Sequence, residues 1–257
     1  MFKMVLFACF FSLFMSSAAL AHFGMVIPSR STAISQKEAE VSLQLSFSHP
    51  MEMQGMPLAR PESFSVYFEG RAEDLLSGLK AAQVMGKEAW TARYTPKRPG
   101  VYQFVMKPVP YWEPAEDCFI QHYTKTYLAA FGEEEGWGDP LGLETEIVPL
   151  TRPFGNYAGN IFQGRVLLQG KPVPWAEVEV EYYNQDNAYQ APDAYFVTQV
   201  VKADSNGVFS YVVPFAGWWG FAALNTIADK MEYEETPKDL ELGAVLWLEF
   251  VKPVNGK

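Results

Sequence analysis

The ten residues from Val41 to Pro50 read VSLQLSFSHP. The valine, the leucines and the phenylalanine alternate with polar residues, and this period of two predicts a β-strand with one buried face. Proline stops the strand directly after His49, which has the parity of the apolar residues. We therefore expect the His49 imidazole at the rim of a sheet, pointing toward the end of a sandwich.

The same alternation recurs along most of the chain. It is found at residues 64–68, 90–94, 101–106, 176–181, 198–203, 208–213, 221–224 and 245–251. Only Glu73–Met85 has spacing that favours a short helix. Short strands punctuated by glycine and proline are typical of antiparallel sandwiches. We predict an all-β protein with two antiparallel β-sandwich domains of the immunoglobulin or prealbumin-like type.

The segment Gly142–Pro153 is the best candidate for a domain boundary. It carries two prolines and a run of charges before a fresh strand begins. We place an N-terminal sandwich at residues 22–147 and a C-terminal sandwich at 148–257. The acidic stretch Met231–Leu242 contains a proline and is interpreted as a solvated excursion between two late strands.

Composition excludes several classes of protein. The 257 residues are 49% hydrophobic and 19% charged, which argues against a disordered chain. Twenty Lys and Arg against thirty Asp and Glu give a formal net charge of −10. Such a surface repels phosphate backbones, so no nucleic acid is expected as a partner. Cations are the partners that this charge favours.

The first 21 residues have the pattern of a secretory signal peptide. A basic start with Lys3 precedes an apolar run from Met4 to Met15, and Ala19-Leu20-Ala21 forms an A-x-A cleavage site. The apolar run is too short to span a bilayer. We therefore expect an exported, periplasmic protein that is not itself membrane-spanning. Removing residues 1–21 would also leave Cys118 as the only cysteine, so no internal disulfide is expected.

The three histidines all lie in the first half of the chain, at His22, His49 and His122. Cleavage after Ala21 would make His22 the first residue, and its free α-amine and imidazole Nδ1 could then chelate one ion. Imidazole suits nickel, cobalt, copper and zinc. Each histidine alone is more simply a rim residue, but the three together predict a metal site.

The segment that follows His49 reads PMEMQGMP over residues 50–57. It places three methionines and one glutamate in a loop bracketed by proline and glycine. Thioethers are soft ligands that favour Cu(I), whereas the carboxylate of Glu52 is a harder donor. We regard Glu52 and Met51 as candidates to complete the shell, although methionines also serve as flexible apolar filler.

No recognisable enzyme signature is present. The sequence has no G-x-S-x-G elbow, and nothing pairs two carboxylates for acid–base chemistry. We therefore predict a protein that is not an enzyme, with no catalytic residues. Tyr111-Trp112 and Trp218-Trp219 could stack on sugars, although the second pair, between two glycines, is better suited to a core or a domain junction.

Several segments, taken in order, resemble an exported β-sandwich family catalogued as a domain of unknown function. They are His22–Pro28, Ser48–Pro50, Tyr111–Asp117, His122–Lys125, Glu146–Leu150, Gly170–Pro172, Lys202–Gly207 and Gly217–Phe221. That family includes the extracytoplasmic components of energy-coupling-factor nickel and cobalt importers, of the NikK/CbiK type. The resemblance implies a periplasmic protein that captures Ni²⁺ or Co²⁺ for the membrane subunits of an importer.

Two alternatives remain open on the sequence. A terminal histidine with a second histidine can hold reactive copper, so a copper-binding protein or copper oxygenase is the first. A sandwich module that binds glycans or another protein is the second, and in that case Tyr111 and Trp112 would matter more than any histidine.

Overall fold

The structure is a computed structural model, and it describes residues 22–254. The predicted signal peptide and its cleavage site at Ala21 lie outside the described residues. Apart from three short 3-10 helices, the regular elements are strands, so the predicted all-β class is confirmed. The 3-10 helices are Gln36–Glu38, Leu76–Gly78 and Ala194–Phe196. In the described part of the chain, no helix is long and apolar enough to cross a membrane.

The strands of residues 22–254 form three sheets. A five-stranded sheet has the order β1 (Phe23–Pro28), β3 (Val41–His49), β8 (Lys87–Tyr94), β7 (Lys80–Val84), with β4 (Gln54–Met56) beside β3. A four-stranded sheet contains β12 (Thr145–Pro149), β14 (Ile161–Leu168), β15 (Lys171–Pro172) and β18 (Val208–Val212).

An eleven-stranded sheet lies between these two and runs through the whole molecule. Its main path is β17 (Gln199–Lys202), β16 (Glu177–Tyr182), β19 (Gly217–Tyr233), β20 (Thr236–Val251), β11 (Cys118–Ala130), β9 (Gly100–Lys107), β5 (Ser63–Phe68) and β6 (Arg71–Asp74). The short strands β2 (Thr32–Ala33), β10 (Tyr111–Glu113) and β13 (Asn156–Tyr157) pair at its margins. Two sandwiches therefore share one sheet.

The two halves are joined by the pairing of β20 with β11. Most pairs in the molecule are antiparallel, but these two strands run parallel from Cys118 opposite Asp239 to Thr126 opposite Trp247. One apolar core fills the space between β1, β3, β8 and the β5–β9–β11 part of the central sheet. The other lies between β12, β14, β18 and the β16–β19–β20 part. The predicted boundary near residue 147 falls inside β12.

The predicted helix at Glu73–Met85 is wrong. Its residues form the end of β6, a single 3-10 turn and the edge strand β7. Met85 and Gly86 both have positive φ, as a tight β-hairpin requires, and β7 pairs antiparallel with β8. Backbone pairing with β8 thus outweighs the helical spacing of Leu75, Leu76 and Leu79.

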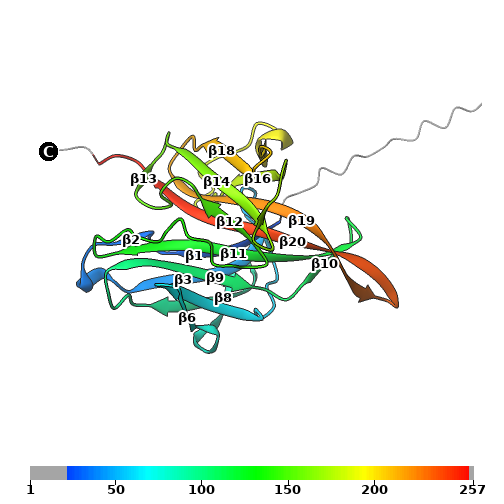
Figure 1. Cartoon of the computed structure of the whole chain (residues 1–257), viewed down its shortest axis with the longest axis horizontal. Coiled ribbons are helices and arrows are strands. Elements are labelled where there is room, and N and C mark those ends of the chain that lie inside the picture. Colours follow the sequence, from blue (N-terminus) through cyan, green and yellow to red (C-terminus); the bar gives the residue numbers. More distant parts are fainter. Residues whose placement is uncertain (1–21, 255–257) are drawn as a thin grey trace, which may run out of the picture.

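The segment Met231–Leu242 is a largely exposed excursion, as predicted, but it is a paired hairpin and not a loop. Its residues belong to β19 and β20, which continue as a two-stranded arm beyond the body of the molecule (Figure 1). The arm is held near its turn, because Trp112 stacks on Tyr233, the last residue of β19, at 4.0 Å, and Lys238 forms an ion pair with Asp117 at 2.6 Å.

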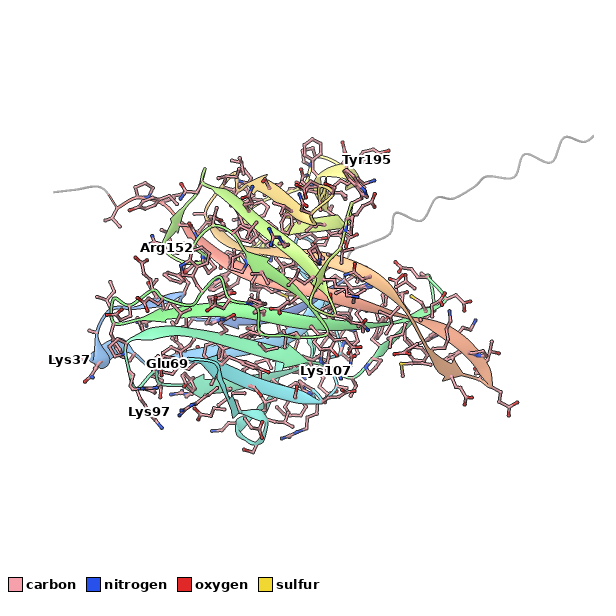
Figure 2. The ribbon with its side chains drawn as sticks, in the orientation of Figure 1. Lys37, Glu69, Lys97, Lys107, Arg152 and Tyr195 are labelled. Carbon is pink, nitrogen blue, oxygen red and sulfur yellow. The ribbon has the colours of Figure 1, made fainter. Side chains whose placement is uncertain are left out.

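A buried ion pair fixes the segment that links the two sandwiches. Lys125 Nζ lies 2.8 Å from Glu146 Oε2, and their side chains are 1% and 2% exposed. Glu146 also accepts hydrogen bonds from the backbone N–H groups of Leu141 and Gly142. On the outside of the segment, Arg152, labelled in Figure 2, pairs with Glu134.

We expect Glu146→Gln to lower the free energy of unfolding by about 3–5 kcal/mol, because the Lys125 ammonium would remain buried without its counter-charge. Urea denaturation monitored by tryptophan fluorescence measures the change. The double variant Lys125→Met/Glu146→Gln is the control and should recover much of the loss. A Glu146→Gln protein as stable as the wild type would contradict this role of the pair.

A candidate metal centre at the rim of the first sandwich

The strand β1 carries His22 to the candidate site. All six of its residues are buried. Its register with β3 pairs Phe23 with Ser48, so the residue before β1, His22, and the last residue of β3, His49, come side by side. Their ring centroids lie 4.4 Å apart. Two histidines that are 27 positions apart in the sequence thus form one pair.

One residue of β1 is held on both sides by hydrogen bonds. The Gly24 N–H donates to His122 Nδ1 at 3.1 Å, and the Trp247 indole donates to the Gly24 carbonyl at 2.8 Å. A side chain at this position would collide with Thr124, because a Cβ atom would lie 2.4 Å from its Oγ1. Glycine is therefore required for β1 to approach the central sheet this closely.

The carboxylate nearest His22 belongs to Glu113. One of its oxygens lies 3.4 Å from His22 Nε2, and both side chains are largely buried, at 13% and 7% exposure. Glu113 ends β10, which folds back on the start of β11 with Glu113 opposite Cys118. Tyr111, two residues earlier, also packs near His22. Burial and the Glu113 carboxylate raise the pKa of Tyr111 to about 12.

Burial keeps two of the imidazoles neutral at physiological pH. The pKa of His22 is lowered to about 4, mainly by burial and also by the neighbouring His49, against the opposing effect of Glu113. The pKa of His122 is lowered to about 3, by burial and by His22. A neutral imidazole has a lone pair to offer, which is the state that metal ligation requires.

His122 is placed beside this pair, but its ring nitrogens are used differently. It is 2% exposed, and Phe47 packs against its ring at 5.5 Å. Nδ1 accepts the Gly24 N–H, so in the neutral ring the proton lies on Nε2, which is buried and has no hydrogen-bond partner. The ring also rests on Gly243, where a Cβ atom would lie 2.3 Å from Cδ2.

Met51 and Glu52 lie toward the second sandwich. The Met51 N–H donates to the Glu181 carboxylate at 3.3 Å, and its carbonyl accepts from the Asn184 side chain at 3.2 Å. Both residues line a cavity together with Asn184. The carboxylate that the structure places against His22 is Glu113, which sequence analysis did not single out as a ligand. Glu113 lies in Tyr111–Asp117, one of the segments that carry the family resemblance, and this was the one indication of its importance in the sequence.

The candidate metal ligands are not drawn into a closed cage. In the described residues, one trio of His, Cys, Asp or Glu has its ligand atoms all within 4.8 Å of one another, and it consists of Glu116, Cys118 and Glu241. Burial and the surrounding carboxylates raise the pKa of Cys118 to about 12, so its thiol stays protonated and is a poor ligand at neutral pH.

The tryptophans considered as sugar platforms are occupied by protein contacts. Trp218 and Trp219 are 9% and 3% exposed and belong to the apolar cores. Trp112 is covered on one face by Tyr233. These three rings therefore serve packing in this structure.

Comparison with known proteins places the chain in a family. Residues 19–227 match the family described as "Domain of unknown function (DUF4198)". The chain belongs to this family. No curated protein matches it.

Among solved structures, the matches are weak. The D0-D1 domain of intimin is 10% identical, covers 90% of this chain and 100% of its own, and has a TM-score of 0.24. The Yersinia pseudotuberculosis adhesin InvE is 10% identical with coverages of 87% and 58% and a TM-score of 0.26. The titin Ig tandem A164-A165 is 9% identical with coverages of 88% and 98% and a TM-score of 0.20. No function is transferred from them.

The lowered pKa of His122 makes stability depend on pH with a defined sign. Between about pH 6.5 and 3 the unfolded chain binds a proton that the folded chain excludes, so this group destabilises the fold as pH falls. Glu181, whose pKa burial raises to about 8, acts in the opposite direction, so the histidine must be isolated by a variant.

We expect His122→Asn to keep an acceptor for Gly24 while removing the titration. The stability difference between wild type and this variant should shift in favour of the variant by up to about 1.4 kcal/mol per pH unit below pH 6.5. Urea denaturation at pH 7.5, 6 and 5 measures it, with His122→Ala as the control that also loses the acceptor. A difference independent of pH would contradict the buried, neutral state of His122.

Proposed function

We propose that this chain is an exported, periplasmic protein that binds a divalent transition metal, nickel or cobalt, for uptake by a membrane importer. The observation that carries the proposal is the pairing of His22 with His49 at 4.4 Å, beside the Glu113 carboxylate. The register of β1 and β3 brings these imidazoles together, and burial favours the neutral, ligating form of His22.

The chemistry of this donor set fits a metal of borderline softness. His22 Nε2 faces Glu113, and a carboxylate beside one ring nitrogen favours the tautomer that leaves the other nitrogen unprotonated. The other nitrogen is Nδ1, which lies on the same side of the ring as the backbone. Once cleavage after Ala21 frees the α-amine, the amine and Nδ1 form a bidentate clamp, and His49 supplies a further nitrogen.

His122 acts in this proposal as a positioning residue. Its Nδ1 holds the Gly24 N–H, two residues from His22, so it fixes the strand that presents the clamp. The backbone of Met51 is tied to the second sandwich through Glu181 and Asn184, and Met51 and Glu52 both line the cavity on that side. The carboxylate of Glu113 acts from outside the ligand shell, because it accepts the Nε2–H of His22 and so orients the ligating ring.

The resemblance of the sequence to the importer components supports the proposal, because those components are exported metal carriers. The chemistry of two imidazoles and an amine also suits copper, which the general affinity order places above nickel and cobalt. Copper binding is therefore the alternative that the same residues allow. The proposal includes no catalytic step.

We expect the protein beginning at His22 to bind Ni²⁺ and Co²⁺ with one ion per chain. His22→Ala and His49→Ala should each weaken Ni²⁺ binding at least about 30-fold, since each removes a nitrogen ligand, and Glu113→Gln should weaken it by about 10–100-fold, as outer-shell partners do. Isothermal titration calorimetry with Ni²⁺, Co²⁺, Cu²⁺ and Zn²⁺ measures these affinities.

Glu88→Gln, on the edge strand pair β7–β8, is the matched control for loss of one carboxylate and should bind as the wild type does. Nickel affinity unchanged by both histidine variants would refute the site. Tight Cu²⁺ binding with no measurable Ni²⁺ or Co²⁺ binding would replace the proposal by the copper alternative.

The part played by the α-amine is tested by one additional residue. A protein that carries a single alanine before His22 keeps both imidazoles but converts the amine to an amide, which is a poor ligand at neutral pH. We expect Ni²⁺ affinity to fall at least about tenfold, because the α-amine and Nδ1 of His22 can no longer chelate the ion together. Equal affinity of the two proteins would show that the imidazoles bind without the terminus.

A further inference from the structure

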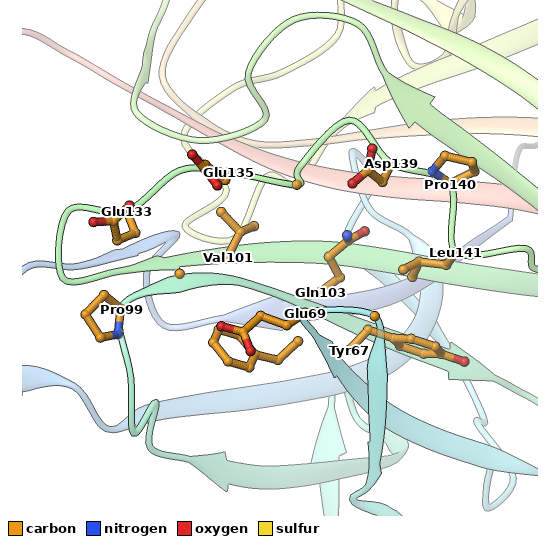
Figure 3. A pocket seen from close by; sticks show the side chains of 14 residues that line it. Tyr67, Glu69, Pro99, Val101, Gln103, Glu133, Glu135, Asp139, Pro140 and Leu141 are labelled. Atoms are coloured by element: carbon orange, nitrogen blue, oxygen red, sulfur yellow. The ribbon is translucent and has the colours of Figure 1, made fainter.

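A second cavity lies on the opposite side of the central sheet from β1. Its volume is about 530 Å³, and it is bounded by the β5–β6 turn, the start of β9 and the segment that links β11 to β12 (Figure 3). The floor is formed by apolar groups that include Tyr67, Val101 and Leu141. The cavity is separate from the histidines and from every residue of the proposed metal site.

The rim of this cavity is acidic. Glu133, Glu135 and Asp139 line it from the linking segment, and Glu69 lines it from the β5–β6 turn. Glu69 is paired with Arg98 at 2.8 Å. Successive side chains of the linking segment point in opposite directions. Glu134 therefore points outward to Arg152, while its two neighbours line the cavity. In the described part of the chain, no lysine or arginine lines the cavity.

A buried amide gives independent support for a ligand. Gln103 is 6% exposed, and its Oε1 atom is buried without a hydrogen-bond partner. Figure 3 shows this side chain rising from β9 into the cavity, toward the segment that carries Asp139. An unpaired buried carbonyl oxygen is costly, and a ligand that donates an N–H would remove that cost.

Hydrogen bonds fix the segment between β11 and β12 that carries the acidic residues of the cavity. The Tyr127 hydroxyl donates to the carbonyl of Trp137, at the middle of the linking segment. The Glu146 carboxylate accepts the N–H groups of Leu141 and Gly142 at its end. The acidic residues are therefore presented at fixed positions on the rim, around the apolar floor.

The chemistry of the cavity points to an organic cation. In the described residues, its carboxylates do not form a trio within 4.8 Å, which disfavours a preformed cage for a bare metal ion. Spaced negative charges around an apolar floor match a chain of methylenes that carries several ammonium groups. The net charge of −10 would attract such a ligand.

We propose that this cavity binds a linear aliphatic polyamine. Its ammonium groups pair with Glu133, Glu135 and Asp139, one N–H donates to Gln103 Oε1, and the methylene stem lies along Val101 and Leu141. The site is independent of the proposed metal function, so each can fail without the other.

The test uses the full chain and isothermal titration calorimetry with spermidine, putrescine, n-butylamine and Mg²⁺. We expect spermidine to bind at least tenfold more tightly than n-butylamine, with one molecule per chain, and to weaken at high salt. The double variant Glu135→Gln/Asp139→Asn should lose at least tenfold in spermidine affinity. Gln103→Leu should lose about threefold to tenfold without any change in charge.

Glu234→Gln/Glu235→Gln, at the tip of the arm, is the control with the same change in charge and should retain wild-type affinity. Circular dichroism of each variant checks that it is folded, and unchanged Ni²⁺ binding by the Glu135/Asp139 variant keeps this result separate from the metal proposal. Equal affinity for spermidine and n-butylamine, equal loss in the control, or preference for Mg²⁺ would overturn the polyamine site.

Discussion

The double hydrogen bond to Gly24 is the constraint on which the proposed site depends. His122 on β11 accepts a hydrogen bond from the N–H of this residue, and Trp247 on β20 donates one to its carbonyl. The strands β11 and β20 join the two sandwiches. The two hydrogen bonds of Gly24 therefore tie β1 to both halves at their junction. The position of His22, two residues away, is therefore set by the packing of the whole molecule rather than by a local turn.

The strand β1, which these two hydrogen bonds hold in place, is buried on both faces. Val26 contributes to the core of the first sandwich, while Phe23, Met25 and Ile27 pack on Trp247 and its neighbours. A strand with polar groups accounted for and apolar residues on each side has little freedom to move. That rigidity suits the role proposed for His22, which is to present its imidazole to an ion.

Sequence reasoning predicted the strands and the place of His49 at the end of one of them, because alternation and proline placement act locally. The contact of His22 with His49 depends on the register of β1 with β3, which no local pattern encodes. Sequence reasoning missed Glu113, since only the return of β10 onto β11 brings that carboxylate to His22. It also missed the continuous central sheet. Parallel pairing of Cys118–Thr126 with Asp239–Trp247 joins segments over a hundred residues apart, and no local pattern encodes that contact. The helix predicted at Glu73–Met85 does not form for a related reason, which is that the end of this segment pairs with β8 as the strand β7.

Burial, more than charge, governs the protonation of His22 in the proposed site and of the two interior acids of β16. It lowers the pKa of His22 to about 4 and raises that of Glu179 to about 7 and of Glu181 to about 8, so histidines and acids alike are driven toward neutrality. A divalent ion brings charge that would reverse this balance for nearby carboxylates. The two interior acids of β16 are driven toward the neutral form, whereas the exposed acids of the second cavity offer charge to solvent. The two candidate sites therefore differ in the physics of recognition: ligation by neutral nitrogen in one, and pairing with ammonium groups in the other.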